Sequence, residues 1–262
     1  MLEFIIGSDN LKKKTKIKYK KNTLLKIIII LLSVVIITVF GFFIYVGDYY
    51  HADIKSIETF NESKEIKKEI KNDKFITYSK DNPNIGFIFY PGGKVEHLAY
   101  EPLMMSLAEN NIFCVLTKMP YNLAVFDINA AKEIQKLYPE IDTWYIGGHS
   151  LGGSMAASFL ENNHTQYNGL ILLGSYSTSN LKNTNLSVLS IYGSNDKVLN
   201  IEKYKKNKNN LPVNFQETII DGGNHSYFGM YGNQNGDGKA SITNEEQINK
   251  TTNLIITFIK EN

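Results

Sequence analysis

One serine in the chain has neighbours that would make it a nucleophile. Ser150 is the central residue of Gly148-His149-Ser150-Leu151-Gly152, which fits the pattern G-x-S-x-G. The apolar run before it predicts a strand and the small residues after it predict a helix, so the serine falls at a sharp strand-to-helix turn. Glycine is expected on both sides because side chains at so tight a bend would collide. The pattern predicts an exposed hydroxyl that attacks a carbonyl carbon.

A serine hydroxyl needs a base that removes its proton and a third group that orients the base. Of the five histidines, His225 is the best base, because it lies in a loop directly after a predicted strand. Asp196 also follows a predicted strand and is the first candidate for the orienting acid. Asp221, four residues before His225, is the rival. The chain order Ser150, Asp196, His225 is that of hydrolases with this type of turn and favours Asp196.

A carbonyl oxygen under attack becomes negatively charged and needs hydrogen-bond donors. The backbone N–H of Leu151 opens the helix after the serine, at the positive end of that helix. A second donor is expected from Pro91-Gly92-Gly93-Lys94, the loop after the predicted strand 85–90. We assign this role to the N–H of Gly93, since glycine lets a backbone approach a substrate closely. A plain turn without this role is the alternative.

Other features do not predict sites. Cys114, the single cysteine, lies in an apolar run and is interpreted as a small buried hydrophobe. The loop 233–238, which contains Asp237, resembles the first half of a calcium-binding loop, but its second half lacks the expected glutamate. Lys94 and Lys118 follow strand ends and are interpreted as solvated. We therefore expect no metal and no cofactor.

Composition bears on the class of partner. The 262 residues are 43% hydrophobic and 12% aromatic, which supports a large buried core. Every basic side chain is Lys, so no guanidinium is present for bidentate recognition of phosphate. Residues 1–26 carry eight Lys against Glu3 and Asp9, a net charge of +6, so against a total of +2 residues 27–262 carry −4. We expect no nucleic-acid partner for this mildly acidic part.

The N-terminal part indicates a membrane anchor. Residues 27–46 form an uncharged apolar run, about 30 Å long as a helix and sufficient to cross a bilayer. A cleaved signal peptide is the alternative, but its apolar core is normally about 7–15 residues long. Because the Lys-rich flank of a span stays in the cytoplasm, we expect a single-pass protein of the cell membrane. Its residues 1–26 would be cytoplasmic and its catalytic part extracytoplasmic.

The rest of the chain predicts a stalk and one domain. Residues 47–73 are highly charged, and their apolar residues have loosely helical spacing, so we expect a helical stalk there. From residue 74 onward, strand-like and helical patterns alternate. The expected strands are 74–79, 85–90, 112–118, 143–148, 168–174, 187–193 and 213–220, and the expected helices are 99–110, 127–138, 151–163, 200–208 and 244–260. This alternation predicts an α/β domain over 74–262, with a mostly parallel sheet and helices on both faces.

Three motifs together resemble a known family. Phe89-Tyr90-Pro91-Gly92-Gly93-Lys94, Lys118-Met119-Pro120-Tyr121-Asn122-Leu123 and Gly147-Gly148-His149-Ser150-Leu151-Gly152-Gly153 are similar to the α/β-hydrolase superfamily. Within it they resemble the subgroup called α/β-hydrolase fold-5, akin to dienelactone hydrolases. The resemblance implies the α/β-hydrolase sheet and a triad of Ser150, Asp196 and His225. It implies no substrate, because the superfamily hosts many activities. The run Pro91-Gly92-Gly93 departs from the more usual His-Gly-Gly.

These features predict a membrane-anchored serine hydrolase that cleaves an ester or similar acyl bond of a small molecule through an acyl-enzyme. An acyltransferase with the same triad and a non-catalytic binding protein on the same fold are the alternatives. Lids of this fold are commonly inserted after the strand that follows the elbow helix, where only residues 175–186 are found here. So short a connection cannot form a lid domain, and we expect a shallow site for short acyl groups.

Overall fold

The computed structural model describes the backbone of residues 2–262 and the side chains of Lys13 and of residues 25–262. The chain divides into two compact units, Met1–Asp48 and Tyr49–Asn262. The Lys-rich segment 1–26, which we expect to be cytoplasmic, lies mostly outside the described side chains. Each unit is described by itself.

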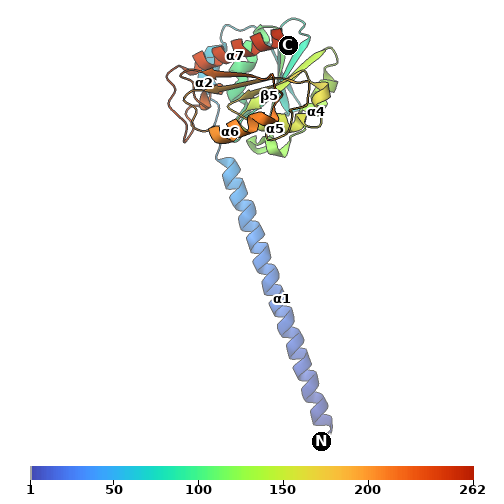
Figure 1. Ribbon diagram of the computed structural model, residues 1–262. Helices are drawn as coiled ribbons and strands as arrows, with labels where there is room; N and C mark the ends of the chain where they lie inside the picture. The colour runs from blue at the N-terminus through green and yellow to red at the C-terminus, as the bar shows by residue number, and fades with distance from the viewer. Residues whose placement is uncertain (1) are drawn as a thin grey trace. The chain divides into compact units, whose positions relative to one another are not determined.

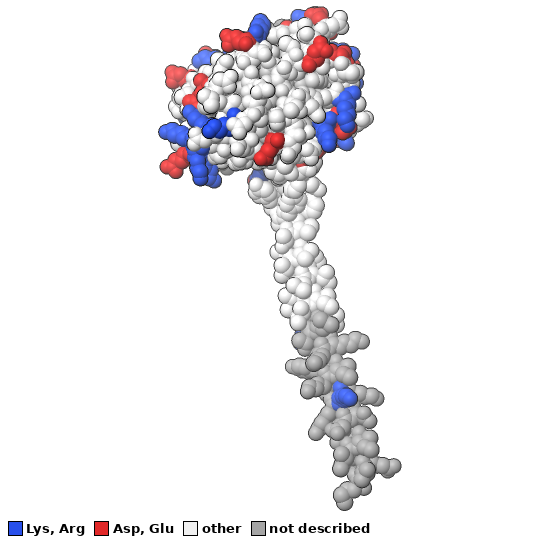
Figure 2. Space-filling view, turned by 45° about the vertical axis from the view of Figure 1, so that its right-hand side comes forward, with Lys and Arg blue, Asp and Glu red and all other residues white. Residues whose placement is uncertain are grey.

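The first unit is the helix α1 (Leu2–Gly47). Its stretch Leu25–Gly47 is the one segment of the described chain that is long and apolar enough to cross a membrane. Its 23 residues span about 35 Å as a helix, more than the hydrocarbon thickness of a bilayer. Figure 2 shows almost all of this stretch as uncharged surface. A membrane span and a signal sequence both have these properties.

The second unit is built on one eight-stranded sheet, in the order β1-β2-β4-β3-β5-β6-β7-β8. The strands are β1 (Lys67–Lys71), β2 (Phe75–Ser79), β3 (Ile85–Tyr90), β4 (Ile112–Thr117), β5 (Thr143–His149), β6 (Gly169–Leu173), β7 (Ser187–Gly193) and β8 (Gln216–Ile220). β2 runs antiparallel to both β1 and β4, whereas all the other neighbours are parallel. The expected mostly parallel sheet is confirmed.

Helices cover both faces of this sheet, as predicted (Figure 1). One face packs against α2 (Ile54–Asn61), α3 (Glu101–Glu109) and α7 (Asn244–Glu261), and the other against α4 (Ala131–Leu137), α5 (Leu151–Leu160) and α6 (Ile201–Asn207). Along β3, Phe87 and Phe89 face the first group, whereas Ile88 and Tyr90 face the second. Successive side chains of a strand point to opposite faces of the sheet. A strand that is buried on both faces, such as β3, therefore needs apolar residues at every position. Cys114 of β4 is fully buried in the first core.

The structure differs from the expected stalk over 47–73. The helix α2 covers only eight residues, after Asp53, whose side chain accepts the N–H of Ser56. Residues Lys67–Lys71 form the edge strand β1, which pairs with β2. Lysines on an exposed edge strand prevent pairing with other chains. Because β1 consists mostly of such charged residues, it lacks the alternation of apolar and polar residues from which a strand is predicted. The sheet therefore starts before residue 74, and the compact unit starts at Tyr49.

The fold places the candidate site residues at one edge of the sheet. The strands β3, β5, β6, β7 and β8 are parallel, so the loops that follow them meet at their carboxyl ends. These loops carry, in the same order, Gly93, Ser150, Gly174, Asp196 and His225. On the face of the unit seen in Figure 2, Lys and acidic side chains occur side by side.

Candidate active site

Ser150 lies in the turn between β5 and α5, with φ 51° and ψ −120°. This left-handed backbone is strained for a residue that has a Cβ atom. The turn is tightly packed, since a Cβ atom added at Gly148 or Gly152 would collide with the carbonyl oxygen of Tyr90. Ser175 Oγ donates a hydrogen bond to the carbonyl oxygen of Ser150 at 2.6 Å. The serine is therefore held in a strained turn by contacts from two neighbouring strand ends.

His225 and Asp196 form a buried pair. His225 Nδ1 lies 2.8 Å from Asp196 Oδ2, and both side chains are only 1% exposed. The other carboxylate oxygen of Asp196 accepts the N–H groups of Val198 at 2.9 Å and Leu199 at 2.8 Å. An ionised carboxylate accepts all three hydrogen bonds, so it fixes the proton of His225 on Nδ1. The Nε2 atom of His225 is left with a free lone pair.

Ser150 and His225 line one pocket of about 270 Å³. No hydrogen bond joins them: within the described chain His225 Nε2 is buried and has no partner. Hydrogen bonds of this kind are often long in free enzymes and shorten when substrate binds. Asp221, the rival acid, is exposed and accepts a hydrogen bond from Ser194 Oγ at 3.3 Å. The structure thus brings Asp196 to His225 and leaves Asp221 outside the pair.

The two residues expected to supply the oxyanion donors, Gly93 and Leu151, lie in contact. A Cβ atom added at Gly93 would be 2.8 Å from Leu151 Cδ2 and 3.2 Å from Leu151 Cβ. In the loop after β3, the N–H of Gly92 donates to a tyrosine hydroxyl at 3.1 Å and that of Lys94 to a carbonyl oxygen at 2.8 Å. The N–H of Gly93 has no acceptor in the part of the chain that the structure describes. It is the donor of this loop that remains for a substrate oxygen.

The ring of His149 packs against the ring of His225. The centroids of the two rings are 4.4 Å apart, and His149 Nδ1 lies 2.8 Å from the Tyr100 hydroxyl. The Tyr100 oxygen also accepts the backbone N–H of Gly92 at 3.1 Å, so this hydroxyl links the loop after β3 to His149. Burial and the nearby His225 hold the pKa of His149 well below its usual range. This neutral ring supports His225 and does not compete with it for a proton.

Gly174 is a site residue that the sequence analysis missed. It directly follows β6 and has φ +50°, and a Cβ atom there would lie 3.0 Å from His225 Nδ1 and 3.3 Å from Asp196 Oδ2. Any larger residue would therefore be strained and would press on the buried pair. The available signal was a glycine directly after a buried strand, but that pattern alone does not say which side chains it faces.

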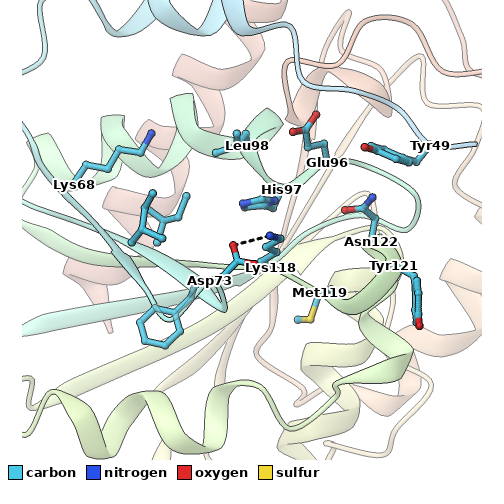
Figure 3. A pocket seen from close by; sticks show the side chains of 13 residues that line it. Tyr49, Lys68, Asp73, Glu96, His97, Leu98, Lys118, Met119, Tyr121 and Asn122 are labelled. Atoms are coloured by element: carbon cyan, nitrogen blue, oxygen red, sulfur yellow. Dashed lines mark hydrogen bonds and ion pairs between the residues drawn. The ribbon is translucent and has the colours of Figure 1, made fainter. Parts of the chain in front are cut away.

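A larger hollow, of about 580 Å³, lies apart from Ser150 (Figure 3). It shares no lining residue with the Ser150 pocket. In it Lys118 and Asp73 form an ion pair at 2.7 Å, so this lysine is balanced by a carboxylate. His97 also lines this hollow, and burial, aided by Lys118, lowers its pKa. Volume alone favours the larger hollow, but the smaller pocket holds the serine and the histidine, and we place the active site there.

Comparison with known proteins identifies the family. The sequence model of the Alpha/beta hydrolase family matches residues 86–249, whereas a comparison with curated proteins finds no match. A predicted CIB-like hydrolase from Thermoplasma acidophilum is similar in structure, with a TM-score of 0.52, 15% sequence identity and coverage of 74% of this chain and 100% of that chain. TT1662 from Thermus thermophilus is also similar, with a TM-score of 0.56, 11% identity and coverage of 75% and 98%. These two likenesses concern the fold alone. The family match includes Ser150, Asp196 and His225, and the chain belongs to the α/β-hydrolase family.

Proposed function

We propose that the protein is a serine hydrolase that cleaves an ester or similar acyl bond. The observation that carries the proposal is the buried pair of His225 and Asp196, whose histidine lines the same pocket as the strained Ser150. Two ionisable side chains are costly to bury, and their alignment beside the pocket of a strained serine supports catalysis over a binding role alone. Membership of the α/β-hydrolase family supports hydrolase activity in general.

Each residue has one role in the proposed reaction. Ser150 Oγ attacks the carbonyl carbon while His225 Nε2 takes its proton, and Asp196 stabilises the resulting imidazolium. The N–H groups of Leu151 and Gly93 bind the oxygen that becomes negative. The imidazolium then protonates the leaving alcohol, which departs and leaves an acyl-enzyme. Water then attacks the acyl carbon while His225 takes one of its protons, and His225 returns this proton to Ser150 Oγ as the acid departs, which restores both residues.

The pocket supports short acyl groups as substrates. Its volume of about 270 Å³ is below the roughly 300–1,000 Å³ typical of sites for drug-sized ligands. Residues 174–186, between β6 and β7, contain no helix or strand, so no lid domain is present at the place where this fold commonly has one. Tyr176 and Leu199 line the pocket and limit the length of a bound chain.

We also propose that the stretch Leu25–Gly47 anchors the protein in the cell membrane. Its length and apolar surface support this assignment. The Lys-rich segment 1–26 supports an orientation in which the N-terminus is cytoplasmic and the second unit is extracytoplasmic.

Replacement of the serine tests the proposed nucleophile. Ser150→Ala should abolish labelling by a fluorophosphonate probe and lower hydrolysis of p-nitrophenyl acetate by about 10⁴-fold or more, because the attacking oxygen is lost. Ser154→Ala is the matched control, since it removes another hydroxyl that lines the pocket, and it should still be labelled. Undiminished labelling of Ser150→Ala would end the serine-hydrolase proposal.

The two candidate acids are distinguished by amide substitutions. Asp196→Asn should lower kcat by about 10³–10⁴-fold, because the amide favours the wrong tautomer of His225. Asp221→Asn should lower kcat by less than about threefold, since the exposed Asp221 does not touch the base. The measurement is the steady-state rate of ester hydrolysis by both variants. The reverse ranking would transfer the role of the acid to Asp221.

A panel of esters with two to sixteen acyl carbons tests the size of the site. The protein should be a variant that begins at Tyr49, because the N–H and C=O of Tyr50 pair with Lys94 and Glu96 in the loop after β3. We expect kcat/KM to be highest for the shortest chains, with no jump in rate when a substrate forms droplets. A preference for the longest chains together with interfacial activation would contradict the shallow site.

Protease added to intact cells or spheroplasts tests the proposed orientation. It should degrade the second unit and spare the N-terminal segment, which should be recovered with the membrane. A cytoplasmic marker protein that stays intact is the control for lysis. Full protection of the second unit would show that the orientation is wrong or that the helix does not span the membrane.

A further inference from the structure

The carboxylate of Asp237, which lies outside the proposed triad, accepts hydrogen bonds from the backbone next to His225 and next to Asp196. Asp237 Oδ2 accepts the backbone N–H of Ser226 at 2.9 Å, and Asp237 Oδ1 accepts that of Lys197 at 3.2 Å. Ser226 directly follows His225, and Lys197 directly follows Asp196. A single side chain, from a later part of the connection between β8 and α7, therefore ties the residues next to His225 to the loop after β7.

The residues after Asp237 add to this tie. Asn224 Nδ2 donates to the carbonyl oxygen of Gly238 at 2.9 Å, and Asn195 Nδ2 donates to that of Lys239 at 3.1 Å. A Cβ atom added at Gly238 would collide with the carbonyl oxygen of Asn195. Residues 237–239 thus pack directly on Asn195 and Asn224, which precede Asp196 and His225 in the chain.

The surroundings of Asp237 explain why a carboxylate is present there. Its Oδ1 atom also accepts the N–H of Gly238 at 2.7 Å, so three backbone donors point at one anion. Hydrogen bonds to a charged acceptor are stronger than neutral ones. The N–H groups of Ser226 and Lys197 have no other acceptor in the described structure. These three backbone donors account for the carboxylate at position 237, in the loop 233–238 whose spacing resembles half of a calcium site.

We propose that Asp237 is a positioning residue that fixes the alignment of Asp196 with His225 by binding the backbone next to each. The inference rests on the proposed function, because it acts through that pair. Loss of the tie would let the two loops shift relative to each other, and misplacement of a catalytic group by about 1 Å can cost about 10²-fold in rate. Substrate binding would be spared, because Asp237 does not line the Ser150 pocket.

Kinetics of the full-length chain with substitutions at position 237 test the inference. Asp237→Ala should lower kcat for p-nitrophenyl acetate by about 10- to 100-fold and change KM by less than about twofold. Asp237→Asn should fall between this variant and the wild type, since one amide oxygen replaces two carboxylate oxygens. Asn233→Ala, an exposed change in the same loop, is the matched control and should keep the wild-type kcat. All rates are measured at a temperature where thermal melts show every variant to be folded.

A double-mutant cycle separates positioning from general damage. In the Asp196→Asn background, Asp237→Ala should lower kcat by less than about twofold, because the pair through which Asp237 acts is already broken. If Asp237 acted on kcat independently of the Asp196–His225 pair, its effect would multiply with that of Asp196→Asn, and such additivity would overturn the inference. An unchanged kcat in Asp237→Ala and Asp237→Asn would do the same. A different result would overturn the proposed function itself: a wild-type protein that shows no ester hydrolysis, or hydrolysis that Ser150→Ala does not remove.

Discussion

The close packing of the turn at Ser150 is the constraint on which the rest of the site depends. The turn leaves no room for a side chain at Gly148 or Gly152, because the carbonyl oxygen of Tyr90 lies against both positions. The strained backbone of Ser150 is maintained because β3 and α5 press on the turn from both sides. The same approach brings the loop after β3, with Gly93, next to Leu151. The proposed nucleophile and the two proposed oxyanion donors are thus positioned by one contact between neighbouring strands.

The proposed base, His225, is positioned by a different means, through a buried carboxylate and hydrogen bonds between loops. Asp196 uses one oxygen for His225 and the other for two backbone N–H groups, so the acid is itself held in place. His149 supports the other side of the His225 ring, and Asp237 bonds to both loops. Loops are the most variable parts of a fold, so a site built on them needs such ties to stay aligned.

Much of this architecture follows from local sequence patterns, and the remainder depends on contacts between distant residues. The strands 85–90 and 187–193 are found at the predicted boundaries because buried apolar runs give strong signals. The edge strand β1 was not predicted, since its charged residues carry no such signal. The contacts of Gly174, Tyr100 and Asp237 join residues from different loops, and one sequence does not show which loops meet.

A crystal structure of the protein after reaction with a small fluorophosphonate tests the proposed site most directly. The phosphorus atom should be bonded to Ser150 Oγ, and its oxygen should lie about 2.7–3.1 Å from the backbone nitrogen atoms of Leu151 and Gly93, as for an oxyanion. An adduct on any other residue, or a phosphonyl oxygen that points away from these two nitrogen atoms, would contradict the assignment of the nucleophile and its oxyanion donors.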